Sequence, residues 1–359
     1  MKINRIKTLL TAALLSLCVS VSAYDFTVDS LYYNIVSPGK LTCEVTFRSY
    51  NNKYHGDIVI PETVNYDNKI FTVVGISSEA FYECSELSSV TIPKTLTYID
   101  SQAFRGCKAI TCIAIPGSVK YIGTMAFYEC QNLNNIVFED GDKTLEWEYF
   151  VDFTGHVCPI FYNCPIDSLY IGRNLKCTDE YYAHGLFEDS SVKKLTVGNT
   201  VTEIENYLFY ACYQLNEVSL GDSVTSIGKN AFRNCENLTE ISLGKSVAEI
   251  GSAALSGCEN LTTIYSLNPT PPTFNSAEFT NSQYIHINVY VAKGSLTAYQ
   301  TADIWKKFWN IEEYSTETGI ESITVDNGQK NRIYDLQGRK LETPQHGINI
   351  INGKKVQIK

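Results

Sequence analysis

The sequence predicts a repeat solenoid, mostly β with short helical turns and about eight rungs. A phenylalanine returns every 23 residues at Phe81, Phe104 and Phe127, and the same spacing separates Phe209 from Phe232. A cysteine follows each of these phenylalanines three positions later. Apolar and polar residues then alternate, which is the pattern of a half-buried β-strand. Each unit therefore buries its apolar edge against its neighbours, and the phenylalanines are expected to stack.

Two rungs between Cys130 and Cys212 depart from the period. Alignment on the apolar strand residues places Asn163 and Asp189 where the other rungs have cysteine. The extra residues fall in an insertion at 139–159 and around 173–185. We therefore predict two decorated rungs inside the array.

Six of the 12 cysteines share one repeat position. Small polar residues at a tight bend can satisfy backbone groups, and cysteine is readily buried. We predict a column of free, buried thiols rather than the disulfide framework that cysteines in an exported protein usually suggest. Cys158 and Cys164 lie outside this column and are candidates for a pair. The column consists of Cys84, Cys107, Cys130, Cys212, Cys235 and Cys258.

Residues 1–23 predict a secretory signal peptide. Basic residues precede an apolar run at 9–21, and Val21-Ser22-Ala23 offers a cleavage site of small residues. A membrane anchor is the alternative, although the run is short for a span. Without this segment, which carries three basic residues, the net charge changes from −10 to −13. The signal indicates export, to the extracellular space or the cell surface, and the acidic surface argues against a nucleic-acid partner.

The remaining chain divides into four predicted parts. Short strand patterns in residues 24–75 indicate an N-terminal β cap for the open end of the solenoid. The solenoid itself covers 76–267. Residues 268–314 follow as a C-terminal cap, and 315–359 form a linker and a small β module.

The C-terminal cap begins with a proline-rich stretch that we expect to end the ladder. Pro271 and Pro272 lack the amide hydrogen that a ladder needs. A strand over 285–291 and a helix over 296–309 are expected to follow. In the module beyond, Asn352-Gly353 predicts a two-residue hairpin turn.

The unit Ala-Phe-x-x-Cys-x-x-Leu-x-x-Val-x-Ile-Pro-x-x-Leu-x-x-Ile, as it stands at 80–99, resembles the BspA-type leucine-rich repeat of bacterial surface proteins. Residues 334–339 and 347–356 resemble a C-terminal module of secreted Bacteroidota proteins. The resemblance implies a leucine-rich repeat solenoid in a secreted or cell-surface binding protein. It further implies adhesion or protein–protein interaction through the repeat face, without catalysis.

The outward strand positions form three columns of mostly small, polar residues. Aromatic side chains anchor interfaces better than such residues do, because they remove a large apolar area from water. We therefore predict that binding centres on the insertion and the outward positions beside it. The competing account is that the insertion aromatics fold inward as a local core. The predicted binding residues are Val137, Trp147, Tyr149, Phe150, Tyr170 and Tyr265.

The expected partner is a host or matrix protein, or a surface glycan. A glycan-binding accessory protein is the first alternative, and its mark is a set of exposed, coplanar insertion aromatics. An enzyme with a site at the insertion, using His156, Cys158 or His184, is the second. The five histidines are scattered and no catalytic motif stands in the chain, so we predict no catalytic residue, no metal site and no cofactor.

Overall fold

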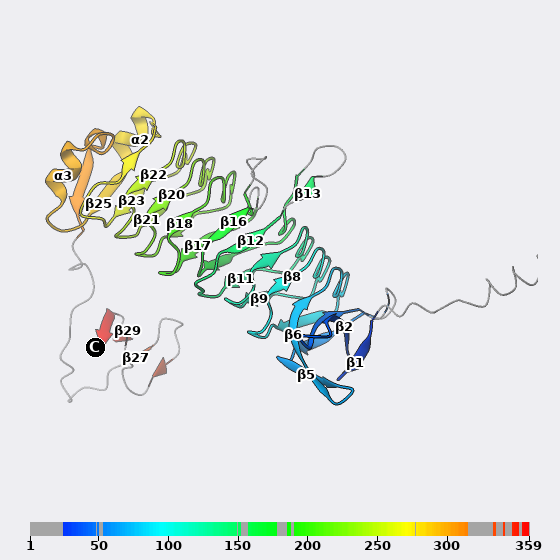
Figure 1. Ribbon diagram of the computed structural model, residues 1–359. Helices are drawn as coiled ribbons and strands as arrows, with labels where there is room; N and C mark the ends of the chain where they lie inside the picture. The colour runs from blue at the N-terminus through cyan, green and yellow to red at the C-terminus, as the bar shows by residue number, and fades with distance from the viewer. Residues whose placement is uncertain are drawn as a thin grey trace, which may run out of the picture.

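The computed structural model describes residues 24–47, 49, 53–148, 150–151, 157–177, 185–187, 190–276 and 278–314, and four strands between 333 and 358. Turns of nearly equal size stack into a rod that runs from the N-terminal strands to the C-terminal helices (Figure 1). The predicted repeat solenoid is confirmed, with about nine turns.

One long sheet, here called the front sheet, contains one strand from each of nine turns, and all its pairs are parallel. In every strand except the last, Asn310–Glu313, the residues that face the core are buried, and most of those between them are half-buried or exposed. The front-sheet strands are β9 (Cys112–Ile115), β11 (Asn135–Phe138), β15 (Ser168–Ile171), β17 (Lys194–Val197), β19 (Glu217–Ser219), β21 (Glu240–Leu243), β23 (Thr263–Ser266), β25 (Asn288–Val291) and β26 (Asn310–Glu313).

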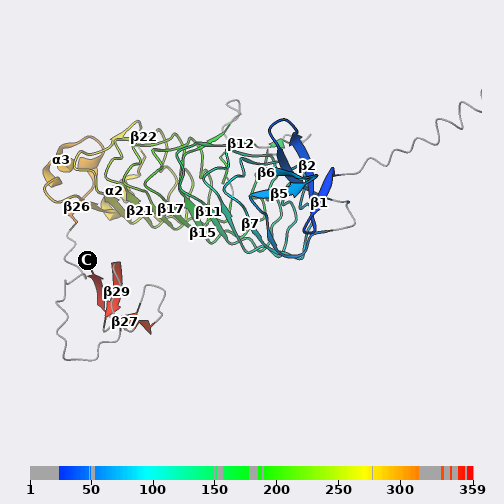
Figure 2. The same ribbon diagram turned by 60° about the horizontal axis from the view of Figure 1, so that its bottom comes forward.

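The opposite side of the rod, here called the back wall, is built from strands of two or three residues (Figure 2). It divides into two parallel runs, β8-β10-β12-β16 and β18-β20-β22-β24. The back-wall strands are β8 (Tyr98–Ile99), β10 (Tyr121–Ile122), β12 (Leu145–Trp147), β16 (Leu175–Cys177), β18 (Glu203–Ile204), β20 (Ser226–Ile227), β22 (Glu249–Ile250) and β24 (Thr273–Phe274).

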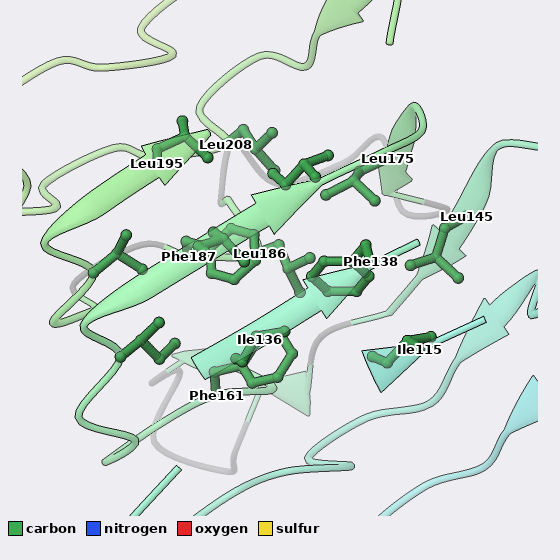
Figure 3. Packing of buried hydrophobic residues seen from close by; sticks show 14 of the residues in the cluster. Ile115, Ile136, Phe138, Leu145, Phe161, Leu175, Leu186, Phe187, Leu195 and Leu208 are labelled. Carbon is green, nitrogen blue, oxygen red and sulfur yellow. The ribbon is translucent and has the colours of Figure 1, made fainter. Parts of the chain in front are cut away.

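A column of stacked phenylalanine rings runs through the core between the two walls. Phe104 is stacked on Phe127 with ring centroids 5.1 Å apart, and the rings of Phe209 and Phe232 lie 5.4 Å apart. All four rings have no exposed area. Figure 3 shows how Phe138, Phe161 and Phe187 fill the wider middle rungs. The expected stacking is therefore confirmed.

The buried cysteines form a second column beside the phenylalanines. From Cys107 onward, each thiol of the column donates to the phenylalanine carbonyl of the preceding rung, as Cys107 does to Phe81 (3.0 Å) and Cys235 to Phe209 (3.2 Å). A small donor is needed here because a buried carbonyl without a partner costs free energy. All six cysteines of the predicted column are free and buried.

Two assignments in this column were wrong by one residue. Cys164, not Asn163, donates to the carbonyl of Phe127 (3.1 Å), and Asn163 is exposed. In the next rung Ser190 lies 3.6 Å from the sulfur of Cys212, while Asp189 is outside the described residues. Both rungs have one residue fewer between the column position and the strand. An alignment based on the strand residues therefore places the column position one residue too early. Cys164 is a free thiol, so the suggested pair with Cys158 is not formed.

The column cysteines are expected to resist thiol reagents until the protein unfolds. Burial raises the pKa of Cys84 to about 11 and that of Cys258 to about 12, from an ordinary value of 9.0. Little reactive thiolate therefore forms at neutral pH. Native and urea-unfolded protein should be alkylated and compared by mass spectrometry, with the exposed Cys112 as the native-state control. A disulfide between neighbours such as Cys84 and Cys107 under non-reducing conditions would contradict this prediction.

The N-terminal strands join both walls of the solenoid. β6 pairs with β8 in parallel and extends the back wall, while β4 pairs with β7 in parallel on the front side. Gly75 makes room for the ring of Tyr98 at the first junction, because a Cβ there would lie 2.0 Å from that ring. These strands are β1 (Phe26–Val28), β2 (Leu31–Ser37), β3 (Thr42–Thr46), β4 (Gly56–Val59), β5 (Thr63–Tyr66), β6 (Lys69–Ile76) and β7 (Leu87–Thr91).

The proline-rich stretch does not end the ladder, contrary to the sequence expectation. Thr273 and Phe274 follow the prolines and form β24, which pairs in parallel with β22. The amide of Thr273 donates to the carbonyl of Ala248 (2.9 Å), so the prolines stand just outside the positions that need a donor. The front sheet also continues, through β25 and β26. The C-terminal segment thus adds further turns to the array.

Helices appear only in this last part of the described chain. An unexpected helix, α2 (Asn281–His286), begins with a capping box formed by Thr280 and Gln283. The helix expected over 296–309 is shorter than predicted. The structure has a helix α3 (Leu296–Thr301) and, after it, a separate 3-10 turn, Trp305–Lys307. The Trp305 ring has no exposed area and its indole donates to the Pro272 carbonyl (2.7 Å).

Two short elements lie outside the regular turns. In the insertion, β13 (Phe150–Val151) pairs antiparallel with β14 (Val157–Cys158). The C-terminal module contains a four-stranded antiparallel sheet in the order β28-β27-β29-β30. Its strands are β27 (Ile333–Tyr334), β28 (Lys340–Leu341), β29 (Gly347–Ile351) and β30 (Lys354–Ile358). The signal segment 1–23 lies outside the described residues.

Candidate binding face

The outward side of the front sheet carries the predicted columns in the predicted register. Val137 pairs with Tyr170, Ser242 pairs with Tyr265, and Tyr265 pairs with Tyr290 on the next strand. These side chains are half-buried by their neighbours on the sheet. Parallel pairing therefore places residues a whole turn apart in sequence side by side on one flat face.

Tyr170 is fixed at the edge of this face by a carboxylate of the preceding turn. Its hydroxyl donates to Asp140 Oδ1 at 2.6 Å, and this bond raises the pKa of Tyr170 to about 12. Gly198 leaves room for the hydroxyl, because a Cβ there would lie 2.4 Å from it. Val137 lies next to Tyr170, so these two predicted binding residues do come together.

Three tyrosines gather at the C-terminal end of the face and are here called the tyrosine cluster. Tyr265 and Tyr290 are stacked, with centroids 5.2 Å apart and planes at 20°. The edge-on ring of Tyr314 lies 5.5 Å from Tyr265, and Tyr314 is 41% exposed. Of these three residues, only Tyr265 was among the predicted binding residues. The alternation in Val289-Tyr290-Val291 was the available signal, but we expected the ladder to end before it.

Charged residues occupy the middle of the face between Tyr170 and the tyrosine cluster. Lys193 pairs with Asp167 at 2.6 Å, and Lys194 pairs with Glu217 at 2.7 Å. All four side chains are at least 42% exposed, so these pairs contribute little stability. The paired charges neutralise one another. Tyr170 and the tyrosine cluster are therefore the main apolar groups on either side of them.

Trp147, one of the insertion aromatics, does not join Val137 and Tyr170 on the front sheet. Trp147 lies in the back-wall strand β12, in register with Ile122 and Cys177, and is 1% exposed. Trp147 therefore takes the alternative arrangement, in which an insertion aromatic folds inward as part of a local core. In this conformation its side chain presents no surface to a partner. Phe150 lies in β13, and Tyr149 is outside the described residues.

Most of the residues suggested for catalysis lie outside the described residues. His156 and His184 lie outside the described residues, and of Cys158 only the strand position in β14 is described. Across the described part of the chain, His, Cys, Asp and Glu side chains form no group of three or more that could hold a metal ion. The helices in that part are too short or too polar to span a bilayer.

Solved structures of several bacterial repeat proteins are similar to this chain. A leucine-rich repeat protein from Bacteroides ovatus is 21% identical, covers 81% of this chain and all of its own, and has a TM-score of 0.30. The T. pallidum leucine-rich repeat protein is 19% identical, with 79% and 93% coverage and a TM-score of 0.33. A leucine-rich cell surface protein from Faecalibacterium prausnitzii is 19% identical, with 83% and 97% coverage and a TM-score of 0.29. No curated protein matches the chain significantly.

The repeats themselves match a sequence family. The model described as "BspA type Leucine rich repeat region" matches residues 46–156 and 181–302 in six copies. The matched residues make up more than half of the chain and include most of the phenylalanine and cysteine columns. The chain therefore belongs to the BspA-type leucine-rich repeat family.

Proposed function

We propose that this protein is an exported surface protein that binds a partner protein through the front sheet. Leucine-rich repeat solenoids are typically binding scaffolds, and the BspA type is associated with bacterial surface proteins. The predicted signal peptide supports export. The observation that carries the proposal is the tyrosine cluster, because it places three aromatic side chains at one end of a regular, polar sheet face.

The front sheet is a suitable support for such contacts. Its inner strands are held by parallel ladders on both sides and pack on a buried core, so little backbone order must be gained on binding. Tyrosine adds contact area at a low entropy cost and offers a hydroxyl for hydrogen bonding. Binding would therefore centre on Tyr265, Tyr290 and Tyr314, with Tyr170 and Val137 as a second contact along the face.

A protein partner fits the tyrosine cluster better than a glycan does. Sugar rings stack on exposed, coplanar aromatic faces, whereas Tyr265 and Tyr290 cover one face of each other's ring. The edges and hydroxyls of such a pair suit the hydrogen-bonding groups of a protein surface. The predicted mark of the glycan alternative was exposed insertion aromatics, and Trp147 is buried.

The partner search should use the mature chain against host matrix proteins and a glycan array. Once a protein partner is found, we expect the double variant Tyr265→Ala/Tyr290→Ala to bind at least about tenfold more weakly, as is usual for aromatic anchors. Tyr213→Ala is the matched control, since Tyr213 is 43% exposed and lies outside the strands of the front sheet. Full affinity in the folded double variant, or binding to glycans alone, would contradict the proposal.

A further inference from the structure

Arg173 occupies a repeat position that faces solvent in the later turns. The equivalent residues, which follow the glycine at the end of each front-sheet strand, are Asn199, Asp222 and Lys245, and all three are exposed. Arg173 instead has no exposed area. Arg173 follows β15 in one of the two decorated rungs. Its inward position thus occurs in a rung that contains extra residues.

The guanidinium group of Arg173 uses only part of its hydrogen-bonding capacity. Nη1 donates to the carbonyl of Val119 at 2.7 Å. Nε and Nη2 are buried and have no hydrogen-bond partner. These two donors lie on the same edge of the planar group and point the same way. They form the fork that binds two oxygens of a carboxylate, phosphate or sulfate group side by side.

The charge on Arg173 has no direct ion-pair partner, although the nearby charge of Glu139 favours the charged form of the guanidinium. Burial lowers its pKa to about 10, so the group stays charged at neutral pH. No described carboxylate forms an ion pair with it. Removing a charge from water without a partner is strongly unfavourable, and buried charges in proteins are accordingly paired.

A groove of about 460 Å³ lies beside Arg173. Gly141 lines this groove, and a Cβ added there would lie 3.5 Å from Arg173 Cδ, so the side chain of Arg173 lies close behind Gly141. Ser118 also lines it, and its buried hydroxyl has no partner. The groove is lined by three lysines and three carboxylates, so its charges balance and an anion would have to be held by the fork itself: Lys94, Lys120, Lys143, Glu139, Asp140 and Asp142.

We propose that Arg173 and Ser118 form a buried binding site for a small oxyanion, entered from the groove beside Gly141. The fork of Nε and Nη2 would hold two oxygens, and the Ser118 hydroxyl would donate to the same anion. Because Arg173 has no exposed area, the ligand is a small free anion such as phosphate, sulfate or a simple carboxylate. Arg173 and Ser118 are not among the residues proposed for partner binding, so the proposed site does not depend on it.

Crystals of the mature protein grown or soaked with selenate, a sulfate analogue with an anomalous signal, test the site directly. We expect an anomalous peak within hydrogen-bond distance of Nε and Nη2 of Arg173. An ordered guanidinium whose two donors meet only water or protein oxygens would overturn the proposal.

Calorimetric titration in solution separates the possible anions. Phosphate, sulfate and acetate should be titrated separately at matched ionic strength, and at least one should bind the wild-type protein saturably. Arg173→Lys keeps the charge but removes the fork, so we expect binding at least tenfold weaker, and Ser118→Ala should weaken it less. Arg233→Lys is the control, because Arg233 is an exposed arginine of a later rung. Absence of saturable binding in the wild-type protein overturns the proposal even if the Arg173 variant does not fold.

Discussion

Replacing Phe209 by alanine is expected to lower the free energy of unfolding by about 3–5 kcal/mol. Phe209 has no exposed area, and its ring is stacked 5.3 Å from Phe187 and 5.4 Å from Phe232. Its truncation removes contacts with two neighbouring turns and leaves a cavity in the centre of the array. Urea unfolding, followed by midpoint and slope, measures the change.

Ser219→Thr is the control for this experiment, because Ser219 belongs to the same turn but lies outward on β19. Its effect should stay below about 0.5 kcal/mol, as is usual for surface substitutions. Equal losses at Phe209 and Ser219 would mean that the inward and outward sides of the turn are assigned the wrong way round.

Trp147→Ala is expected to be similarly destabilising, by about 3–5 kcal/mol. The indole is 1% exposed in the back wall, although the sequence suggested a contact with a partner. Tyr170→Ala should cost less, because the Tyr170 ring is only half-buried and sits at the edge of the front sheet. Thermal unfolding of both variants measures the difference. A Trp147 variant with wild-type stability but reduced partner affinity would return Trp147 to the binding surface.

The fold was predictable because one signal was repeated many times. A single Phe-x-x-Cys pattern is weak, but its return at a fixed spacing defines one turn and aligns the others. The same period predicted which outward residues are neighbours, and Val137 and Tyr170 pair as expected. In a solenoid, each residue meets its own repeat position in the next turn, so sequence alignment and spatial register coincide.

The errors occurred where the period changes. The loss of one residue between Cys164 and its strand moved the assignment to Asn163, because strand patterns do not reveal where a turn is shortened. The prolines before Thr273 suggested an end to the ladder, yet they stand just outside the paired positions. This error also hid Tyr290 and Tyr314, and therefore most of the tyrosine cluster.

The positions of Trp147 and Arg173 depend on packing that the repeat pattern does not contain. An aromatic residue in an insertion can face either side of the chain, and its orientation is set by the space between the two walls. Arg173 occupies a position that is polar and exposed in regular turns, so its burial follows only from the added residues around it. Irregular rungs are therefore where a structure adds most to the sequence.

Hydroxyl-radical footprinting of the tyrosines, with and without a bound partner, tests the front-sheet proposal most directly. Binding at this face predicts that oxidation of Tyr265, Tyr290 and Tyr314 falls when the partner is present. Oxidation of Tyr162 and Tyr213, which are 44% and 43% exposed and lie outside the front-sheet strands, should be unchanged. Protection of Tyr162 or Tyr213 with no change in the tyrosine cluster would contradict the proposal.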